Sequence, residues 1–178
     1  MNKISAVIIT KNEQQNIRRC LNSLVDVVDE IIVVDSYSTD DTEKICNDFD
    51  VEFIKKEFED YSNSKNYGNS MAKHSFILSL DADEAISEEL KESLALVKSN
   101  LKQDGYSFNR RTNYCGQWIY HCGWYPDVKL RLFRKSKAKW EGKIHEILQF
   151  SSDKKTYLKG DLLHYSYPNL SRHAEKMD

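Results

Sequence analysis

The stretch "FILSLDADEAIS", residues 76–87, joins an unbroken apolar run to three acidic side chains. The run "FILSL" does not alternate between apolar and polar residues, which is typical of a strand covered on both faces in a parallel sheet. Asp81, Asp83 and Glu84 follow it directly. Because ligands of open parallel sheets collect at the carboxyl ends of the strands, the stretch predicts a core strand that ends at a polar site.

The same signals recur earlier in the chain and place this strand in an alternating pattern. Shorter apolar runs lie at residues 6–9, 31–34 and, more weakly, 51–54. Amphipathic helical patterns follow at residues 12–26, 38–45 and 87–101. We expect Ser38 or Thr39 to cap the second helix and Ser87 to cap the third. The alternation up to about residue 101 predicts an α/β, doubly wound unit with a mostly parallel sheet flanked by helices.

The remainder of the chain has a different character. From Gly105 onward the sequence is rich in aromatic, β-branched and basic residues, so we predict strands and loops rather than helices. With 178 residues, 40% of them apolar, one domain is the default. We therefore expect a single domain, 1–178, in which residues 1–104 and 105–178 supply two parts of one site.

Composition argues against several classes of protein. The formal net charge of −2 provides no field that favours nucleic acid or an anionic membrane. The four cysteines are far apart and form no CxxC pair, which argues against a zinc knuckle or a disulfide framework. The first apolar run is too short for a signal peptide or a membrane span. We expect a cytoplasmic protein without a nucleic-acid partner.

The first strand lacks the usual phosphate-binding loop. Dinucleotide folds and P-loops need glycines directly after that strand, whereas the first glycine of this chain is Gly68. Asp81 and Asp83 offer another way to hold a phosphate. Residues two apart in an extended segment point to the same side, so both carboxylates can converge on Mg²⁺ or Mn²⁺, which then bridges to the phosphate. Alternatively, Asp83 and Glu84 merely precede a helix and favour its N-terminus.

Four motifs in order, "VIITKNE", "EIIVVDSYSTDDT", "SKNYGNSMAK" and "FILSLDADE", resemble the inverting family 2 glycosyltransferases of GT-A fold. The later motifs "GWYPDVKLRLFRK", "WEGKIHE" and "LLHYSY" are similar to the subgroup that includes lipopolysaccharide core β-glucosyltransferases. The resemblance covers essentially the whole chain. It implies a Rossmann-like GT-A sheet in the first half, which binds the nucleotide sugar, and a mixed acceptor-side region in the second.

The resemblance also implies contacts with the donor nucleotide. Thr10 and Glu13 resemble residues that line the base and ribose. Asp35 resembles the acid that contacts the base, usually uracil, because a carboxylate can accept a hydrogen bond from the imide N–H of uracil. Lys65 takes the place of an arginine in the family, and its cation is expected to meet the base or the diphosphate. Each has a structural alternative: Thr10 ends a strand, Glu13 begins a helix, and a lysine in a polar stretch is ordinarily solvated.

Three residues are implied at a metal site. Asp81 and Asp83 match the DxD motif of the family, with Asp83 expected to contact Mg²⁺ or Mn²⁺ directly and Asp81 to contact ribose or metal. His164 resembles a late histidine that completes the metal shell, since an imidazole ligates Mn²⁺ alongside carboxylates. The alternative for His164 is a core histidine that is hydrogen-bonded at a strand end.

An inverting transfer also needs a base that takes the proton of the acceptor hydroxyl while the diphosphate leaves from the opposite face of the sugar. Glu146 lies where the resembling family usually carries its catalytic acid. Asp127, at the edge of an aromatic loop, is the rival. In the structural interpretation, either acid instead pairs with Lys129, Arg131 or Arg134.

Aromatic side chains of the second half can stack on an acceptor sugar or fill the core of a small β region, and we expect about half of them in the core. They are Tyr114, Trp118, Tyr120, Trp124, Tyr125 and Trp140.

The sequence therefore predicts an inverting, metal-dependent glycosyltransferase that uses a nucleoside diphosphate sugar, UDP-linked in the first instance. The expected acceptor is a saccharide or lipid-linked glycan, such as growing lipopolysaccharide core, with peripheral contact at the inner face of the cytoplasmic membrane. The alternatives are a sugar nucleotidyltransferase, which needs a glycine-rich loop after its first strand, and a nucleotide- or carbohydrate-binding module without turnover. Because similar enzymes continue beyond "LSRHAEKMD" with a helical segment, we expect the C-terminal segment to be shortened.

Overall fold

The computed structural model describes residues 2–143 and 145–167; the C-terminal "LSRHAEKMD" lies outside them. The strands of its central sheet are β1 (Ile4–Thr10), β2 (Glu30–Asp35), β3 (Glu52–Lys55), β4 (Phe76–Asp81), β5 (Glu84–Ile86), β6 (Gly105–Tyr114), β7 (Gln117–Trp118), β8 (Val128–Arg134) and β11 (Lys155–Tyr167). The other elements are α1 (Ile17–Leu24), α2 (Thr42–Cys46), α3 (Tyr61–Met71), α4 (Glu88–Lys98), the short 3₁₀ turn η1 (Lys135–Lys137), and the hairpin of β9 (Ala138–Glu141) and β10 (Ile147–Phe150).

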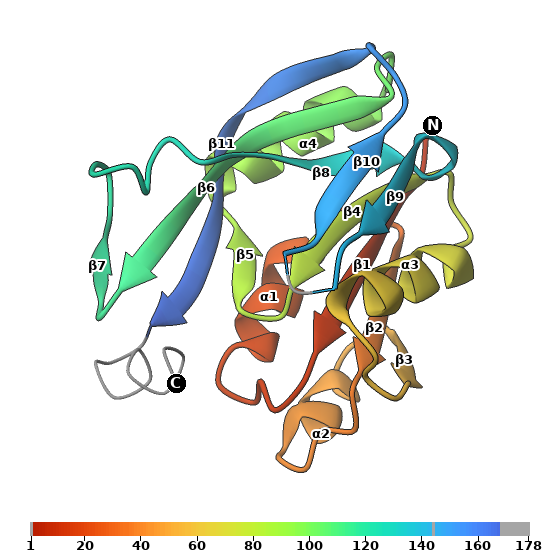
Figure 1. The fold of residues 1–178 in the computed structure, drawn as a ribbon, viewed down its shortest axis with the longest axis vertical. Coiled ribbons are helices and arrows are strands. Elements are labelled where there is room, and N and C mark those ends of the chain that lie inside the picture. Colours follow the sequence, from red (N-terminus) through yellow and green to blue (C-terminus); the bar gives the residue numbers. More distant parts are fainter. Residues whose placement is uncertain (1, 144, 168–178) are drawn as a thin grey trace.

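The central sheet confirms the predicted fold class. Its order is β3-β2-β1-β4-β8-β6-β11-β5, and β7 pairs with β6 (Figure 1). The first four strands are all parallel, β8 enters antiparallel to β4, and β6 and β11 again run in the direction of β1. One sheet of mostly parallel strands therefore continues from the first half of the chain into the second.

The register of the parallel strands aligns their polar ends. Thr10 at the end of β1 lies opposite Asp35 at the end of β2, and Ile9 lies opposite Asp81 at the end of β4. The three polar strand ends that the sequence predicted therefore meet at one edge of the sheet.

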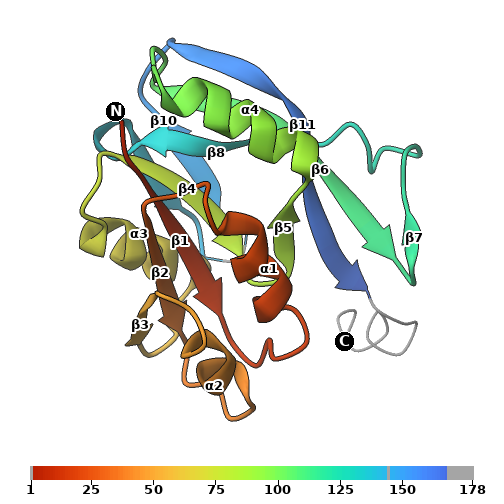
Figure 2. The ribbon, with the colours of Figure 1, turned by 180° about the vertical axis from the view of Figure 1, so that it is seen from behind.

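Both faces of the sheet are covered, which explains the unbroken apolar runs. The helices α1 and α4 pack on one face, where Ala6 and Ile8 of β1 join the larger core cluster (Figure 2). On the other face, Val7 packs in a smaller cluster with Trp140 of β9, beside α3 and the β9–β10 hairpin (Figure 1). Successive residues of β1 thus alternate between two cores.

The helix predictions were right in place and partly wrong at the caps. The Ser87 side chain accepts a hydrogen bond from Leu90 N at 3.2 Å, as predicted for the start of α4. The second helix, α2, begins later than expected, with Asp41 rather than Ser38 or Thr39 in the capping position. The Ser38 hydroxyl donates instead to the Asp35 carboxylate, which keeps this segment in a turn.

The helix α3 was not predicted as a helix, because its sequence has no apolar stripe. It lies close to the sheet through a small residue, Gly68: a Cβ atom there would come within 2.5 Å of Val7 Cγ1 and 3.0 Å of Val34 Cγ2. This close approach brings Lys65, on the same helix, into a fully buried position.

The second half consists of strands and loops, as predicted, with only the 3₁₀ turn as helical structure among its described residues. All four cysteines are free, in agreement with their spacing. Within residues 2–143 and 145–167, none of the helices has the length and apolar character that a membrane span requires.

Candidate functional site

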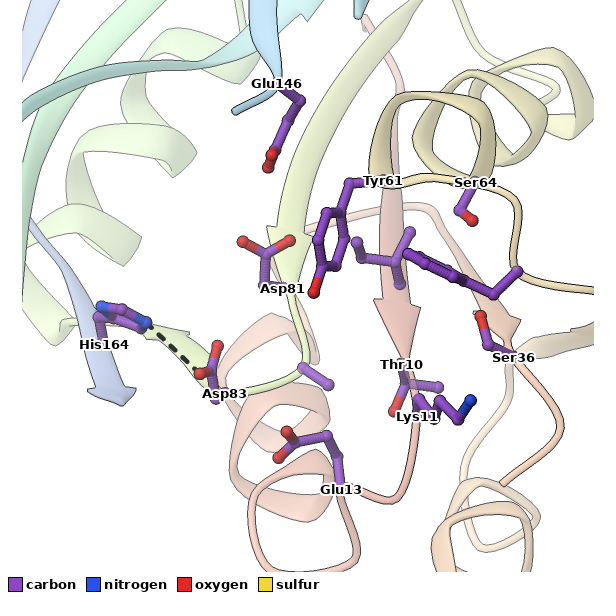
Figure 3. Close-up of a pocket in the computed structure, with 13 residues that line it drawn as sticks. Thr10, Lys11, Glu13, Ser36, Tyr61, Ser64, Asp81, Asp83, Glu146 and His164 are labelled. Atoms are coloured by element: carbon purple, nitrogen blue, oxygen red, sulfur yellow. Dashed lines mark ion pairs between the residues drawn. The ribbon is translucent and has the colours of Figure 1, made fainter. Parts of the chain in front are cut away.

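A pocket of about 460 Å³ opens at the carboxyl ends of β1 and β4 (Figure 3). The loop between β9 and β10, which carries Glu146, and the strand β11, which carries His164, complete its wall. Both halves of the chain therefore contribute to the pocket. Its lining includes Thr10, Lys11, Glu13, Ser36, Phe58, Tyr61, Ser64, Asp81, Asp83, Glu146 and His164. Six of these residues were predicted as site residues from the sequence.

Asp81 ends β4 and is held by two cations. Its Oδ1 atom lies 2.9 Å from Lys65 Nζ, and its Oδ2 atom lies 3.5 Å from Arg131 Nη2. Burial alone would raise the pKa of the Asp81 carboxyl, but the nearby Lys65 and Arg131 outweigh it and hold this pKa well below its usual range. Asp81 is therefore ionised at neutral pH, with its charge already compensated by the protein.

Lys65 lies behind the pocket wall rather than on it. Its side chain is fully buried, 2.8 Å from Glu146 Oε1 and 2.9 Å from Asp81 Oδ1. The ammonium also lies 4.6 Å from the centroid of the Trp140 ring, a cation–π distance. Because Lys65 does not line the pocket, its place favours a role in holding the two carboxylates. Its contact with a base or diphosphate stays a prediction.

Asp83 and His164 meet across the pocket floor. Asp83 lies in the turn between β4 and β5, and its Oδ2 atom is 3.4 Å from His164 Nε2 on β11 (Figure 3). A carboxylate oxygen and an imidazole nitrogen at this separation are suited to contact one Mn²⁺ or Mg²⁺ ion. Within the described residues, no group of three or more His, Cys, Asp or Glu side chains is arranged to hold a metal. The expected triad with Asp81 is thus not assembled, because Asp81 turns toward Lys65 and Arg131.

The structure separates the two candidate bases. Glu146 lines the pocket together with Asp81, Asp83 and His164, whereas Asp127 lies outside it. Asp127 Oδ2 is 2.9 Å from Arg110 Nη2 and Oδ1 is 2.8 Å from Lys129 Nζ. Burial opposes ionisation of Asp127, but Lys129 and Arg110 prevail and lower its pKa, which makes it a weaker proton acceptor.

The other three residues expected at the nucleotide, besides Lys65, differ in their positions. Thr10 and Glu13 line the pocket, and the buried hydroxyl of Thr10 has no hydrogen-bond partner among the described residues. Asp35 is fully buried, and its two carboxylate oxygens accept from Ser38 N at 2.8 Å and Ser38 Oγ at 2.5 Å. Asp35 therefore holds the turn after β2, and its contact with a base stays a prediction. Its neighbour Ser36 reaches the pocket instead.

Two aromatic residues of the pocket were missed by the sequence analysis. Phe58 and Tyr61 are each 46% exposed, and their rings meet edge to face with centroids 5.1 Å apart. They lie before and at the start of α3, in the charged segment "KKEFEDYSNSK". An aromatic pair in such a polar segment has no obvious core to fill, and this was the available signal.

The aromatic residues of the second half are less buried than expected. Of the six predicted to divide between core and acceptor, only Trp140 is buried, at 6% exposure. Tyr120 and Trp124 are exposed, and Tyr114, Trp118 and Tyr125 are half-buried. The expectation that half would belong to the core was wrong, because most lie on a loop and on one edge of the sheet.

Glu84 is a further residue that the structure brings to the site. Only the alternative interpretation of the sequence gave it a role, at the N-terminus of a helix, but it lies in β5 and is 1% exposed. Its Oε1 atom is 3.2 Å from Arg131 Nη2, and Oε2 accepts from Asp81 N at 2.9 Å. Burial raises the pKa of Glu84, against the opposing effect of Arg131. Glu84 and Arg131 therefore both contact Asp81, Glu84 at its backbone N–H group and Arg131 at its carboxylate.

Known proteins are similar to this chain in sequence. An uncharacterized glycosyltransferase of Rickettsia felis is 43% identical over 106 residues, which are 60% of this chain and 38% of that protein. The SPbeta prophage-derived glycosyltransferase SunS of Bacillus subtilis is 38% identical over 148 residues, covering 80% of this chain and 34% of SunS. The lipopolysaccharide core biosynthesis glycosyltransferase LpsC of Rhizobium meliloti is 27% identical over 175 residues, covering 91% of this chain and 63% of LpsC. The chain thus spans little more than a third of the Rickettsia relative.

The fold also agrees with a solved structure. The crystal structure of S. aureus TarS 1-349 superposes with a TM-score of 0.67 at 20% identity, over 92% of this chain and 60% of that one. This similarity confirms the GT-A fold. The model of the family described as glycosyl transferase family 2 matches residues 5–156. Because this match covers most of the chain, the protein belongs to glycosyl transferase family 2.

Proposed function

We propose that this glycosyltransferase moves a sugar from a UDP-sugar to a hydroxyl group of a saccharide acceptor, with inversion at the anomeric carbon. One observation carries the proposal: a single pocket brings Asp81 and Asp83 of the first half together with Glu146 and His164 of the second. Its volume of about 460 Å³ lies in the range of small-molecule sites.

The identity of the donor nucleotide is supported by comparison and by the pocket. The structural neighbour TarS has been crystallised with UDP and with UDP-GlcNAc. In this chain, the exposed rings of Phe58 and Tyr61 provide a face on which a base can stack, since every base has a π-face. The hydroxyl of Thr10, which has no hydrogen-bond partner within residues 2–143 and 145–167, offers a hydrogen bond to the same ligand.

We assign the contact with Mg²⁺ or Mn²⁺ to Asp83 and His164, whose ligating atoms are 3.4 Å apart. When bound, the cation would stabilise the negative charge of the departing diphosphate. Asp81 already has Lys65 and Arg131 as partners, so we place it beside the donor rather than on the cation. Its carboxylate is then available to a ribose or sugar hydroxyl.

We assign the role of general base to Glu146. In the proposed step, its carboxylate takes the proton of the acceptor hydroxyl as that oxygen bonds to the anomeric carbon. The bond from this carbon to the diphosphate oxygen breaks on the opposite face, and its electron pair leaves with UDP, which accounts for inversion. The Lys65 ammonium, 2.8 Å away, holds the Glu146 carboxylate in place.

A surface glycan, such as lipopolysaccharide core, is the acceptor class that we propose. The support is the similarity to LpsC, which extends over 91% of this chain. A cytoplasmic location with peripheral contact at the inner membrane face belongs to the same proposal.

The central test is a calorimetric titration of UDP, GDP, ADP and dTDP. Each nucleotide is titrated with Mn²⁺ and with chelator, into the wild type and into Asp83→Ala. We expect selective binding of UDP that is lost with chelator and weakened at least tenfold by Asp83→Ala. Leu96→Ala, an exposed substitution on α4 away from the pocket, is the control and should bind UDP as the wild type does.

Three results would contradict the proposal. If none of the nucleotides binds, the pocket is not a donor site. If UDP binds but the protein neither transfers sugar to an acceptor nor hydrolyses any UDP-sugar, the chain is a binding module without turnover. Formation of a nucleotide sugar from a sugar phosphate and UTP would instead identify a nucleotidyltransferase.

A further inference from the structure

A second, smaller pocket adjoins the first on its acceptor side. It has a volume of about 310 Å³, and its lining includes Arg110, Trp124, Asp127, Lys129 and His164. His164 also lines the first pocket, so the two spaces share one side chain as their common wall. A ligand in the second pocket therefore lies next to the place where Asp83 and His164 meet.

The two nitrogens of His164 face different pockets. Its Nε2 atom is 3.4 Å from Asp83 Oδ2 in the first pocket. Its Nδ1 atom is 3.4 Å from Thr112 Oγ1, which lines the second. The imidazole thus connects a residue of the donor side with a residue of the second pocket, and it fixes their relative positions.

The second pocket presents an aromatic ring to solvent. Trp124 is 40% exposed, and it packs edge to face against Tyr114, with ring centroids 5.9 Å apart. Tyr167 supports both rings, at 6.2 Å from Trp124 and 5.5 Å from Tyr114. A large ring held by two others, with one part open, is suited to stack on the C–H face of a sugar.

Asp127 provides an ionised hydrogen-bond acceptor beside this ring. Arg110 Nε donates to Oδ2 at 3.0 Å, Arg110 Nη2 lies 2.9 Å from the same oxygen, and Lys129 Nζ lies 2.8 Å from Oδ1. A carboxylate has about four acceptor positions, so about one remains on Oδ1 for a ligand hydroxyl. Asp127, the alternative to Glu146 as the base, is thus placed to accept a hydrogen bond from a ligand hydroxyl instead.

The charges of the second pocket belong to a longer chain of ion pairs that reaches the first. Four acidic and four basic residues alternate along this series of ion pairs, so their formal charges cancel. The contacts in order are Glu146–Lys65 at 2.8 Å, Lys65–Asp81 at 2.9 Å, Asp81–Arg131 at 3.5 Å, Arg131–Glu84 at 3.2 Å, Glu84–Arg110 at 3.9 Å, Arg110–Asp127 at 2.9 Å and Asp127–Lys129 at 2.8 Å.

This balance bears on the kind of ligand. An acidic ligand would compete with Asp127 for Arg110 and Lys129 and would disturb pairs that extend to Asp81. A neutral, hydroxyl-rich ligand leaves every pair in place, because it needs only free acceptor and donor positions. The balance of charge therefore favours an uncharged sugar in the second pocket.

From the shared wall, the open ring of Trp124 and the balanced charges, we propose that the second pocket is a subsite for a neutral sugar unit of the acceptor. The proposal rests on the proposed function, since it requires that the first pocket take the donor. Trp124 stacks on the sugar ring, and Asp127 accepts a hydrogen bond from one of its hydroxyls. Neither residue takes part in the chemical step.

The test is saturation-transfer NMR with methyl glycosides of glucose, galactose and mannose, in the presence of saturating UDP and Mg²⁺. UDP occupies the first pocket, so a glycoside signal reports another place. We expect at least one glycoside to give a signal that falls at least fivefold in Trp124→Ala and in Trp124→Leu, which fills more of the space. Tyr157→Ala is the matched control, because Tyr157 is 49% exposed and lines neither pocket.

The outcomes separate this proposal from the proposed function. Absence of any glycoside signal, or a signal that both Trp124 variants retain, overturns the subsite while calorimetric binding of UDP still stands. Binding of methyl glucuronide at least tenfold tighter than methyl glucoside overturns the assignment to a neutral sugar. If UDP fails to bind, the proposed function fails, and the glycoside measurement without nucleotide still decides whether the second pocket takes a sugar.

Discussion

The Nζ atom of Lys65 lies 2.8 Å from Oε1 of Glu146, although 81 positions separate the two residues along the chain. Lys65 comes from α3 in the first half, and Glu146 comes from the loop before β10 in the second. The same ammonium lies 2.9 Å from Asp81 at the end of β4. One fully buried cation therefore joins the acid of the predicted DxD motif to the proposed catalytic base.

Replacing Lys65 by Met should destabilise the protein and abolish transfer. The substitution leaves Asp81 and Glu146 without their shared cation. Breaking a buried ion pair costs about 3–5 kcal/mol, and because the two acids are partly exposed we expect about 2–3 kcal/mol here. Urea unfolding measures this loss. Lys73→Met is the matched control: Lys73 also has two acidic partners, but it is exposed, and the stability should hardly change. Equal losses in both variants would contradict the importance of the buried cation.

Substitutions of the two candidate bases should separate their roles. Glu146→Gln should lower kcat by about 10²–10⁴-fold, because a general base contributes this much, and should leave the Kd for UDP nearly unchanged. Asp127→Asn should mainly raise the KM for the acceptor. Steady-state kinetics with acceptor varied at saturating donor gives both parameters. The assignment is wrong if Asp127→Asn suppresses kcat and Glu146→Gln does not.

The exposed aromatic pair of the donor pocket should contribute to nucleotide affinity. Stacking of a base on an aromatic ring is worth about 1–3 kcal/mol, so Phe58→Ala or Tyr61→Ala should weaken UDP binding by about 5-fold to 150-fold. Thermal unfolding should change little, since both rings are 46% exposed. Met71→Ala, at the other end of α3 and 40% exposed, is the control. Unchanged UDP affinity in both aromatic variants would remove the base from this part of the pocket.

Asp81 should make stability depend on pH in the acid range. Burial opposes its ionisation, but Lys65 and Arg131 prevail, so the pKa of Asp81 is lower in the folded protein than in the unfolded chain. Its stabilising contribution is therefore complete above the unfolded pKa of about 3.9 and is lost as the pH falls below that value. The difference in unfolding free energy between the wild type and Asp81→Asn should shrink from pH 6 to pH 2. Parallel stability curves would contradict this expectation.

Gly68→Ala tests the close contact between α3 and the sheet. The new Cβ would come within 2.5 Å of Val7 Cγ1, so the helix must shift, and overpacking of this kind costs about 1–3 kcal/mol. Because Lys65 lies on the same helix, kcat should fall as well. Ser70→Ala, at an exposed position of α3, is the control for helix propensity. A Gly68→Ala protein with wild-type stability would show that α3 can move without cost.

Local sequence was sufficient for most of the fold and for the place of the site. The apolar runs predicted β1, β2, β3 and β4, and the Ser87 cap predicted the start of α4, because a strand or cap depends on neighbours within a few residues. The acids after these runs located the pocket edge, since parallel strands end on the same side. The second half was predicted only as strands and loops, and its pairing with β4 through β8 was not foreseen.

The amino-acid sequence by itself determined the α/β class, the strand ends that form the pocket and the acidic residues gathered there. Only the tertiary structure decided what those residues contact. In the folded protein, Lys65 is buried between Asp81 and Glu146, Asp35 accepts a hydrogen bond from Ser38, and Asp127 lines a second pocket. The physical reason is that burial and ion pairing depend on residues that are distant in the chain and meet only when the sheet has formed. A local sequence pattern therefore cannot predict these contacts.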